Sequence, residues 1–459
     1  MVTKEKHKTV KTIKVKFADE NVTSFGGLTL VERIGRRLGL WKELEESIPE
    51  RKGHYDWMTI IKSAIGGLLS GSQGTYATED IRRDKTALRV MGLEEAPEEA
   101  TFWRSLEELG EMVKELGQCQ RKWARETLGR CRRNDLLQRG YVPVFGDGTL
   151  LEGSERREGS KYIKGKGTGL LWVTLFVGSL PVAQRLTKEG EGEGPALRAM
   201  LGEVVAEVLE PLGLKQDALF LMDSLHGDGP MLDELERLGV NYIVGANKLE
   251  ETRRVLMEQS GSMWVEQGKN EQMGWEESAV CVCWIQCGGW SKKRVLVGRR
   301  YKKEGEMFYD YWGVMTSLGV CNKEENFARS VWGLYGIKAG QEDYYKDLLE
   351  DMGLHHPPCQ EHKRNAGFYT VATLAYMVAR AVELIGGKGE ERGQTKRQDG
   401  KKRKRHKPKR MRLWRIRRLL FSLPGRVALH ARQLVVTLLG LNTFTRTLFQ
   451  RFWENIERC

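Results

Sequence analysis

Three carboxylates in this chain stand where they could bind divalent metal ions. Asp147 and Asp223 each follow a short apolar run typical of a buried β-strand, residues 141–146 and 218–222. Glu342 lies in a stretch with helical character. Mg²⁺ prefers hard oxygen ligands and uses few carboxylates, which leaves positions for water and a substrate phosphate. Together, Asp147, Asp223 and Glu342 therefore predict a catalytic metal site that acts on phosphodiesters.

Each of these residues also has a simpler structural explanation. Asp147 with Gly148 is a common turn pair, Asp223 could cap the helix that follows it, and Glu342 could be a charge on a solvated helix face. Asp228 is a rival to Asp223, although no apolar run directly precedes it. The prediction therefore depends on the three residues together and on the elements that position them.

The order of the predicted elements explains how the two aspartates could meet. After Gly140 strand-like and helical patterns follow one another in the order β-β-β-α-β-α-β. The strands are expected at 141–146, 170–177, 180–186, 218–222 and 240–244, and the helices at 195–210 and near 230–238. This is the ribonuclease H-like order, in which the first and fourth strands are neighbours. We therefore expect an α/β fold with a mixed sheet and both aspartates at strand ends, where ligand sites collect.

The chain as a whole divides into four regions that differ in sequence pattern and composition. Apolar residues at helical spacing predict a helical N-terminal domain over 1–135, followed by a candidate catalytic domain over 136–387 that contains the three carboxylates. A β-rich insertion is expected at about 246–320, because strand-like runs and the turn pair Gly288-Gly289 interrupt the pattern there. A basic linker over 388–411 and a helical C-terminal segment over 412–459 complete the predicted organisation.

One segment accounts for the whole formal net charge of +13. Residues 388–418 contain sixteen Lys or Arg against three acidic residues. A solvated charge run is the simpler explanation. The functional alternative is an arm that binds DNA phosphates, because clustered cations displace counterions from nucleic acid. Its candidate contacts are Lys401, Lys402, Arg403, Lys404 and Arg405.

The composition is that of a folded protein without a membrane anchor. Hydrophobic residues make up 40% of the chain, its start is Lys-rich, and Arg380 and Glu383 interrupt its longest apolar stretch. Eight cysteines without a paired framework fit a reducing cytosol. Three of them, Cys281, Cys283 and Cys287, alternate as in a strand, which favours core packing over zinc binding. We therefore expect a cytoplasmic location.

Several motifs resemble those of the DDE transposases of bacterial insertion sequences, the cut-and-paste group with a β-rich insertion in a ribonuclease H-like catalytic domain. Nearly the whole chain takes part in the resemblance. The matching blocks are Asp80-Ile-Arg-Arg-Asp84, Thr101-Phe-Trp-Arg104, Gly146-Asp147-Gly-Thr149, Tyr162-Ile-Lys-Gly-Lys166, Met222-Asp223-Ser224 and the spaced set Tyr335, Lys338 and Glu342. Two positions depart from the family signature: Lys338 stands where Arg is usual, and Leu349 stands where a Lys is frequent, although Lys346 lies one turn after Glu342.

The resemblance implies a transposase that cuts at the terminal inverted repeats of its element and joins the 3′ ends to target DNA. Its implied metal is Mg²⁺, which Mn²⁺ can replace, and its partner is double-stranded DNA, bound by a homodimer in or near a bacterial or archaeal nucleoid. The alternatives are a silenced or repurposed relative that only binds DNA, and a metal-dependent nuclease that does not transpose. The expected DNA contacts outside the basic arm are Tyr335, Lys338, Lys346, Lys164, Lys166, Arg82, Arg83 and Arg104.

Overall fold

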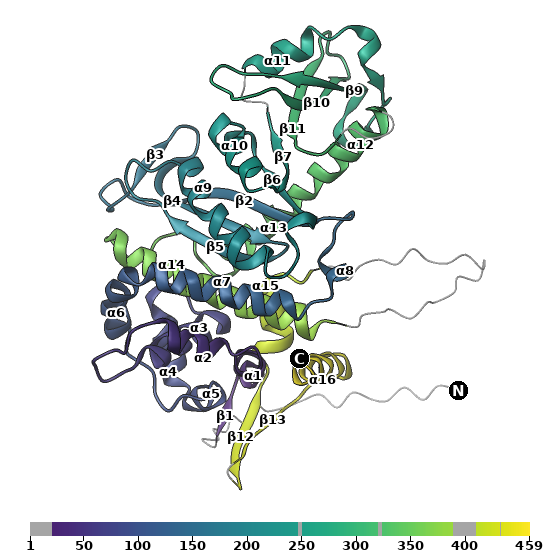
Figure 1. The fold of residues 1–459 in the computed structure, drawn as a ribbon. Helices are drawn as coiled ribbons and strands as arrows, with labels where there is room; N and C mark the ends of the chain where they lie inside the picture. Colours follow the sequence, from purple (N-terminus) through teal and green to yellow (C-terminus); the bar gives the residue numbers. More distant parts are fainter. Residues whose placement is uncertain (1–20, 247–249, 320–323, 389–409, 432) are drawn as a thin grey trace, which may run out of the picture.

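A computed structural model describes residues 21–246, 250–319, 324–388, 410–431 and 433–459 of the 459-residue chain. The predicted DNA contacts Lys401 to Arg405 lie outside the described residues. A large mixed sheet occupies the middle of the molecule, helices from the first part of the chain lie beneath it in Figure 1, and a β-rich lobe lies above it. The chain is therefore a mixed α/β protein with a helical layer on one side.

The sheet has ten strands in the described part of the chain. Its order is β3-β4-β2-β6-β7-β11-β10-β9-β8, and β5 also pairs with β4. The first half comprises β2 (Val142–Glu152), β3 (Lys161–Ile163), β4 (Gly167–Val177), β5 (Leu180–Leu186), β6 (Ala218–Met222) and β7 (Asn241–Gly245). Here β2, β6 and β7 are parallel, whereas β4 runs antiparallel to both β2 and β5. The five strands expected from the sequence are all present, in the spatial order third, second, first, fourth, fifth.

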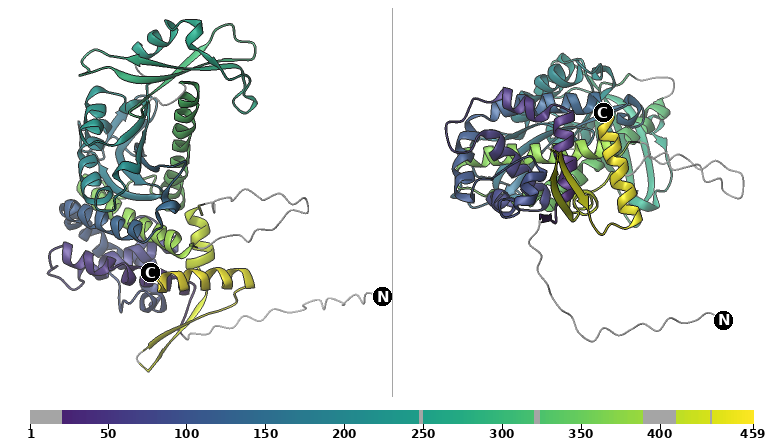
Figure 2. Two further views of the ribbon diagram at one scale, coloured as in Figure 1. Left: turned by 45° about the vertical axis from the view of Figure 1, so that its right-hand side comes forward. Right: turned by 90° about the horizontal axis from the view of Figure 1, so that it is seen from below.

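The β-rich insertion continues this sheet instead of forming a separate one. β11 (Asp310–Thr316) pairs with β7, and β10 (Arg294–Lys303), β9 (Trp275–Ile285) and β8 (Val265–Glu266) follow outward. The insertion also contains helix α11 (Glu250–Met257), and α12 (Glu324–Tyr335) packs against β9 and β10 and leads the chain back to the main sheet. In the left view of Figure 2 the lobe stands at the end of the molecule opposite the C-terminal segment, which is drawn in yellow.

Helix α14 (His362–Ala381) lies between the sheet and the N-terminal helices. It packs against β5 on one side and against α3 (Trp57–Ser70), α6 (Glu99–Glu111) and α7 (Val113–Gly129) on the others. Two glycines permit the contact with α6, because a Cβ on Gly110 would lie 2.1 Å from the Lys363 carbonyl oxygen and one on Gly367 would lie 2.5 Å from that of Leu106. The helix, with its continuation to Gly386, is apolar and long enough to cross a membrane, but 89% of its apolar window is buried inside the protein.

The N-terminal helices and the C-terminal segment pack together. The other elements of this layer are α1 (Thr29–Arg37), α2 (Leu40–Ser47), α4 (Ala77–Arg83), α5 (Lys85–Val90) and α8 (Arg133–Leu136). Strand β1 (Val22–Thr23) pairs with β12 (Gly425–His430), which pairs in turn with β13 (Gln433–Leu438), and α16 (Thr443–Glu457) packs on α1. The C-terminal segment was predicted to be helical, and this was wrong for the hairpin β12–β13, whose apolar residues pair with each other as strands.

Candidate metal-dependent active site

Asp147 and Asp223 are brought side by side by two parallel strands. The pairing of β2 with β6 runs from Val142 opposite Ala218 to Gly146 opposite Met222. Asp147 and Asp223 are the next residue on each strand, so they are neighbours where the parallel pairing ends. The expected strand end at Gly146 was too early, because β2 continues through Asp147 to Glu152 by pairing with β4 alone. Asp147 therefore lies one residue beyond the last parallel step, inside the strand and not at its terminus.

The segment that carries Glu342 returns to this pair of aspartates. It comprises the 3₁₀ helix η8 (Gly336–Gln341) and helix α13 (Glu342–Lys346). Lys338 Nζ lies 3.3 Å from Asp147 Oδ2, and the Tyr345 hydroxyl donates to the Asp147 carbonyl oxygen at 2.8 Å. Glu342 is the exposed first residue of α13, within about one helical turn of both contacts. The segment that carries Glu342 therefore passes beside Asp147, and a place for the Glu342 carboxylate in the site stays a prediction.

Tyr335 lies beside the second aspartate. Its hydroxyl donates to the Met222 carbonyl oxygen at 3.4 Å, and burial together with the charges of Asp223 and Asp147 raises the pKa of Tyr335. Tyr335 therefore stays a neutral hydrogen-bond donor at neutral pH. The Asp223 carboxylate caps the short turn that follows it by accepting from the backbone and hydroxyl of Ser224.

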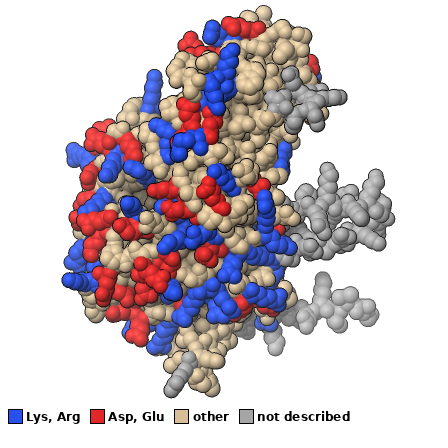
Figure 3. Space-filling model, in the orientation of Figure 1, with Lys and Arg blue, Asp and Glu red and all other residues tan. Residues whose placement is uncertain are grey.

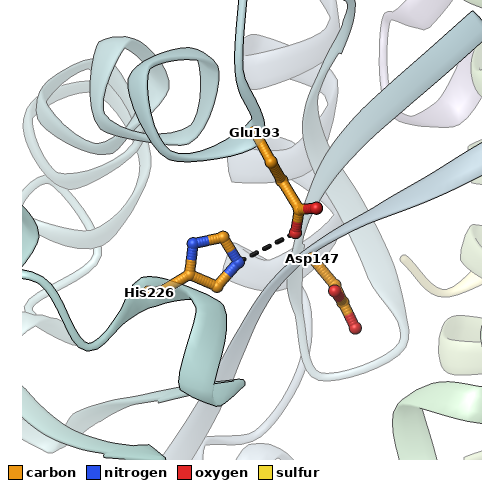
Figure 4. A group of neighbouring side chains, drawn as sticks. All are labelled: Asp147, Glu193 and His226. Carbon is orange, nitrogen blue, oxygen red and sulfur yellow. Dashed lines mark hydrogen bonds and ion pairs between the residues drawn. The ribbon is translucent and has the colours of Figure 1, made fainter. Parts of the chain in front are cut away.

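Two further residues, Glu193 and His226, join the site without having been predicted. Glu193 begins helix α9 (Glu193–Val204), which packs on β4 and β5, and His226 lies in the turn after Asp223. Ligand atoms of Asp147, Glu193 and His226 all lie within 4.8 Å of one another (Figure 4). His226 follows Asp223 by three residues in the sequence, which was the one available signal. Nothing in the sequence pairs either residue with Glu193.

The electrostatics of the cluster are those of crowded carboxylates. Burial raises the pKa of Asp147, Glu193 and Asp223 add to this effect, and Lys338 and His226 oppose it. Burial also raises the pKa of Glu193, but hydrogen bonding and charge from His226, helped by Lys166 and the Gly148 amide, lower it below its ordinary value. A divalent cation would relieve the repulsion between these crowded carboxylates, which Lys338 and Lys166 offset only in part. The donor set, mostly carboxylate oxygens, fits a hard ion such as Mg²⁺ or Mn²⁺.

Asp228, the rival of Asp223, has a structural role. Its Oδ1 accepts from the Met231 amide at 2.8 Å and so caps α10 (Gly229–Arg237). Its Oδ2 lies 3.6 Å from Arg198. The three cysteines that were predicted to pack in the core and not to bind zinc are buried. Cys281 and Cys283 lie in β9, and Cys287 follows that strand.

The predicted DNA contacts are only partly gathered near the carboxylates. Lys164 and Lys166 are exposed in the turn between β3 and β4, and Lys346 is exposed on α13. Lys166 is near enough to Glu193 to lower the pKa of that carboxylate. Lys166 therefore borders the site, and DNA contacts by Lys164 and Lys346 stay a prediction.

The arginines of the helical layer have internal partners. Arg82 and Arg83 both pair with Glu79, and Arg82 also lies 3.9 Å from Glu98. Arg104 is exposed and donates to the Thr101 hydroxyl at 3.2 Å. Figure 3 shows positive and negative side chains interspersed over much of this face of the molecule. A DNA-binding role for these three arginines stays a prediction.

Comparison with known proteins gives little further guidance. No protein-family model matches the chain, and no curated protein matches it. Among solved structures, the cryo-EM structure of a piggyBac transposase synaptic complex with hairpin DNA matches with 11% sequence identity and a TM-score of 0.41. The match covers 82% of this chain and 79% of the other. At this identity and TM-score the likeness establishes neither the family nor the activity of this chain.

Proposed function

We propose that this chain is a DNA transposase that cleaves the ends of its element and joins the 3′ ends to target DNA with the help of divalent metal ions. The observation that carries the proposal is the position of Asp147 and Asp223 at adjacent parallel strands, with Lys338 and Tyr345, from the segment that carries Glu342, in contact with Asp147. The strand order third, second, first, fourth, fifth supports a ribonuclease H-like core, in which such a site acts on nucleic acid.

The residues of the site would divide the work by their chemistry. Asp147, Asp223 and Glu342 would hold the ions, which when bound supply an activated water and stabilise the departing 3′ oxygen. Lys338 keeps a positive charge beside Asp147 and could meet the scissile phosphate. Tyr335, held on the Met222 carbonyl, offers a neutral hydroxyl next to Asp223. The freed 3′-hydroxyl is then the nucleophile of the joining step, so no protein nucleophile is required.

The DNA would lie across the site along its exposed cations. Lys164 and Lys166 stand at the β3–β4 turn, and Lys346 stands on the Glu342 helix. Phosphate contacts of this type position DNA without reading its sequence. Two element ends must be handled together in transposition, which is why we propose a homodimer on DNA.

The test is cleavage and joining by single carboxylate variants. Asp147→Asn, Asp223→Asn and Glu342→Gln should each abolish cleavage of DNA carrying the element ends in Mg²⁺ or Mn²⁺, while gel-shift affinity for that DNA changes little. Asp228→Asn is the matched control, because asparagine also caps a helix well, and it should cleave normally.

The same assay separates the alternatives. Cleaved ends that never join target DNA would indicate a nuclease that does not transpose. Binding without cleavage by the unaltered chain would indicate a silenced relative. Near-normal cleavage by any one of the three carboxylate variants would remove that residue from the site. Inverted repeats that bracket the reading frame in its native DNA would favour a transposase over a nuclease.

A further inference from the structure

Glu193 places its carboxylate beside that of Asp147. Its Oε1 accepts from the Gly148 amide at 2.8 Å and from His226 Nε2 at 2.9 Å. An ionised carboxylate can only accept hydrogen bonds, so Nε2 carries the hydrogen of the imidazole. Both donors use the same oxygen. The Gly148 amide also donates to Asp147 Oδ1 at 3.0 Å, so one amide joins the two carboxylates, and Figure 4 shows Glu193 and Asp147 as neighbours.

The residue next to Asp147 is a glycine for a reason that involves Glu193. Gly148 lies within β2, where a glycine weakens a strand and therefore needs an explanation. A Cβ at this position would lie 2.6 Å from Glu193 Cδ and 2.8 Å from Oε2. Any side chain there would push the carboxylate away from Asp147. The glycine thus provides the space in which Glu193 reaches the site.

His226 is placed to hold this carboxylate. Its side chain is fully buried, and Nδ1 has no hydrogen-bond partner among the described residues, so within this part of the chain the ring is held by its hydrogen bond to Glu193. A buried imidazole that donates to a carboxylate fixes the direction of its remaining oxygen, as partners of metal ligands commonly do. The ring is therefore a positioning group for Glu193.

From this geometry we propose that Glu193 is a fourth carboxylate ligand of the metal site and that His226 positions it. The inference rests on the proposed function, because it assigns further residues to the same site. It explains three observations that Asp147, Asp223 and Glu342 alone leave unexplained: the partly buried acidic residue at the start of α9, the glycine inside β2, and the hydrogen bond that the buried His226 makes to that acidic residue. The ligand class is a hard divalent cation.

The test is direct binding of Mn²⁺ to the protein without DNA, followed by electron paramagnetic resonance of the free ion. Glu193→Gln should weaken Mn²⁺ binding by about tenfold or more, as loss of groups around metal sites commonly does. Gly148→Ala should have a similar effect with no change of charge, because the atoms that must move belong to the flexible end of Glu193. Glu189→Gln, an exposed residue of the preceding turn, is the matched charge control and should bind as the unaltered chain does.

Histidine variants test the positioning role separately. His226→Gln retains an N–H that can donate to Glu193 and should bind Mn²⁺ more tightly than His226→Leu, which cannot donate. Equal affinities of the two variants and the unaltered chain would overturn the role of His226. Circular dichroism on each variant shows whether it is folded, and Gly148→Ala provides the decision if Glu193→Gln is not.

The outcomes distinguish this inference from the proposed function. If Asp147→Asn loses Mn²⁺ and both Glu193→Gln and Gly148→Ala keep it, the fourth ligand is wrong and the metal site stands. If Asp147→Asn also binds Mn²⁺ normally, the metal site itself is wrong. Loss of Mn²⁺ in all three variants, with normal binding by Glu189→Gln, supports both.

Discussion

Asp347 connects the helix of Glu342 to the C-terminal segment. It follows Glu342 by five residues and its carboxylate is completely buried. Oδ1 accepts from Arg412 Nε at 2.7 Å and from the Leu413 amide at 3.1 Å, and Oδ2 accepts from the Tyr376 hydroxyl at 3.0 Å. Arg410 also donates to Oδ2. We expect the substitution Asp347→Asn to loosen both the C-terminal segment and the helix that carries Glu342.

The size of the effect follows from the charge that Asp347→Asn would leave behind. The Arg380 side chain is fully buried and lies 3.7 Å from Asp347 Oδ2. Removing one partner of a buried ion pair costs about 3–5 kcal/mol. Because Glu383 still pairs with Arg380 at 2.7 Å, we expect the lower end, about 3 kcal/mol.

The pKa of Asp347 agrees with a stabilising role. Burial raises it, but the charges of Arg380 and Arg410 lower it more, so the pKa in the folded protein lies below the ordinary value. A carboxylate with a lowered pKa contributes stability that is complete above its unfolded pKa of about 3.9. This contribution is lost as the pH falls through the folded pKa. The loss of folding stability caused by Asp347→Asn should therefore be complete at neutral pH and become smaller below about pH 4.

Hydrogen exchange measured by mass spectrometry at pH 7 is the suitable assay, because a chain of several packed parts need not unfold in two states. A loss of about 3 kcal/mol corresponds to about 150-fold faster exchange of protected amides in residues 347–351 and 413–421. Glu350→Gln is the matched control: Glu350 also contacts Arg412, at 3.2 Å, but 55% of its side chain is exposed. Its loss should cost less than about 1 kcal/mol. Exchange in Asp347→Asn within about fivefold of the unaltered chain would refute the reasoning.

Three further predictions test packing, protonation and the basic arm. Gly67→Ala should destabilise the protein by about 3 kcal/mol or more, because its Cβ would lie 1.6 Å from the Ala77 carbonyl oxygen. Gly202→Ala, in open space on α9, should stabilise its helix by about 0.5–1 kcal/mol, and hydrogen exchange in α3 and α9 measures the two effects. Since the pKa of Asp147 is raised, protons should weaken Mn²⁺ binding at a higher pH than an ordinary aspartate near 3.9 would allow, and constant affinity down to about pH 4 would contradict this. Changing Lys401–Arg405 to Gln should flatten the dependence of log K on log salt by up to about 4.5, equally on cognate and random DNA, and an unchanged slope would leave this segment a solvated linker.

The basic arm also shows where local sequence reading has limits. Sixteen cations were counted together over 388–418, but Arg410, Arg412 and Arg417 are engaged with groups of the protein. The Glu79 partner of Arg82 stands three residues before it and could have been found from helical spacing. Asp347, the partner of Arg412, could not have been found in this way, because the two residues meet only when the C-terminal segment packs on the helix that carries Glu342.

The sequence by itself determined the local elements and therefore the approximate place of the carboxylates. Apolar runs encode buried strands, and the succession of strands and helices placed Asp147 and Asp223 after the first and fourth strands. It did not determine the hairpin at 425–438, since a short apolar run fits a strand or a buried helix equally well. Periodicity reports which face of an element is buried but not which element covers it.

Only the tertiary structure brought Glu193 and His226 to Asp147. The register of β2 with β6 sets the two aspartates side by side, and the packing of α9 on the sheet delivers Glu193 over Gly148. These contacts join residues that are 33 and 45 positions apart. Such contacts depend on how elements pack and on the space that one glycine leaves. The sequence pattern of a single segment predicts neither of these.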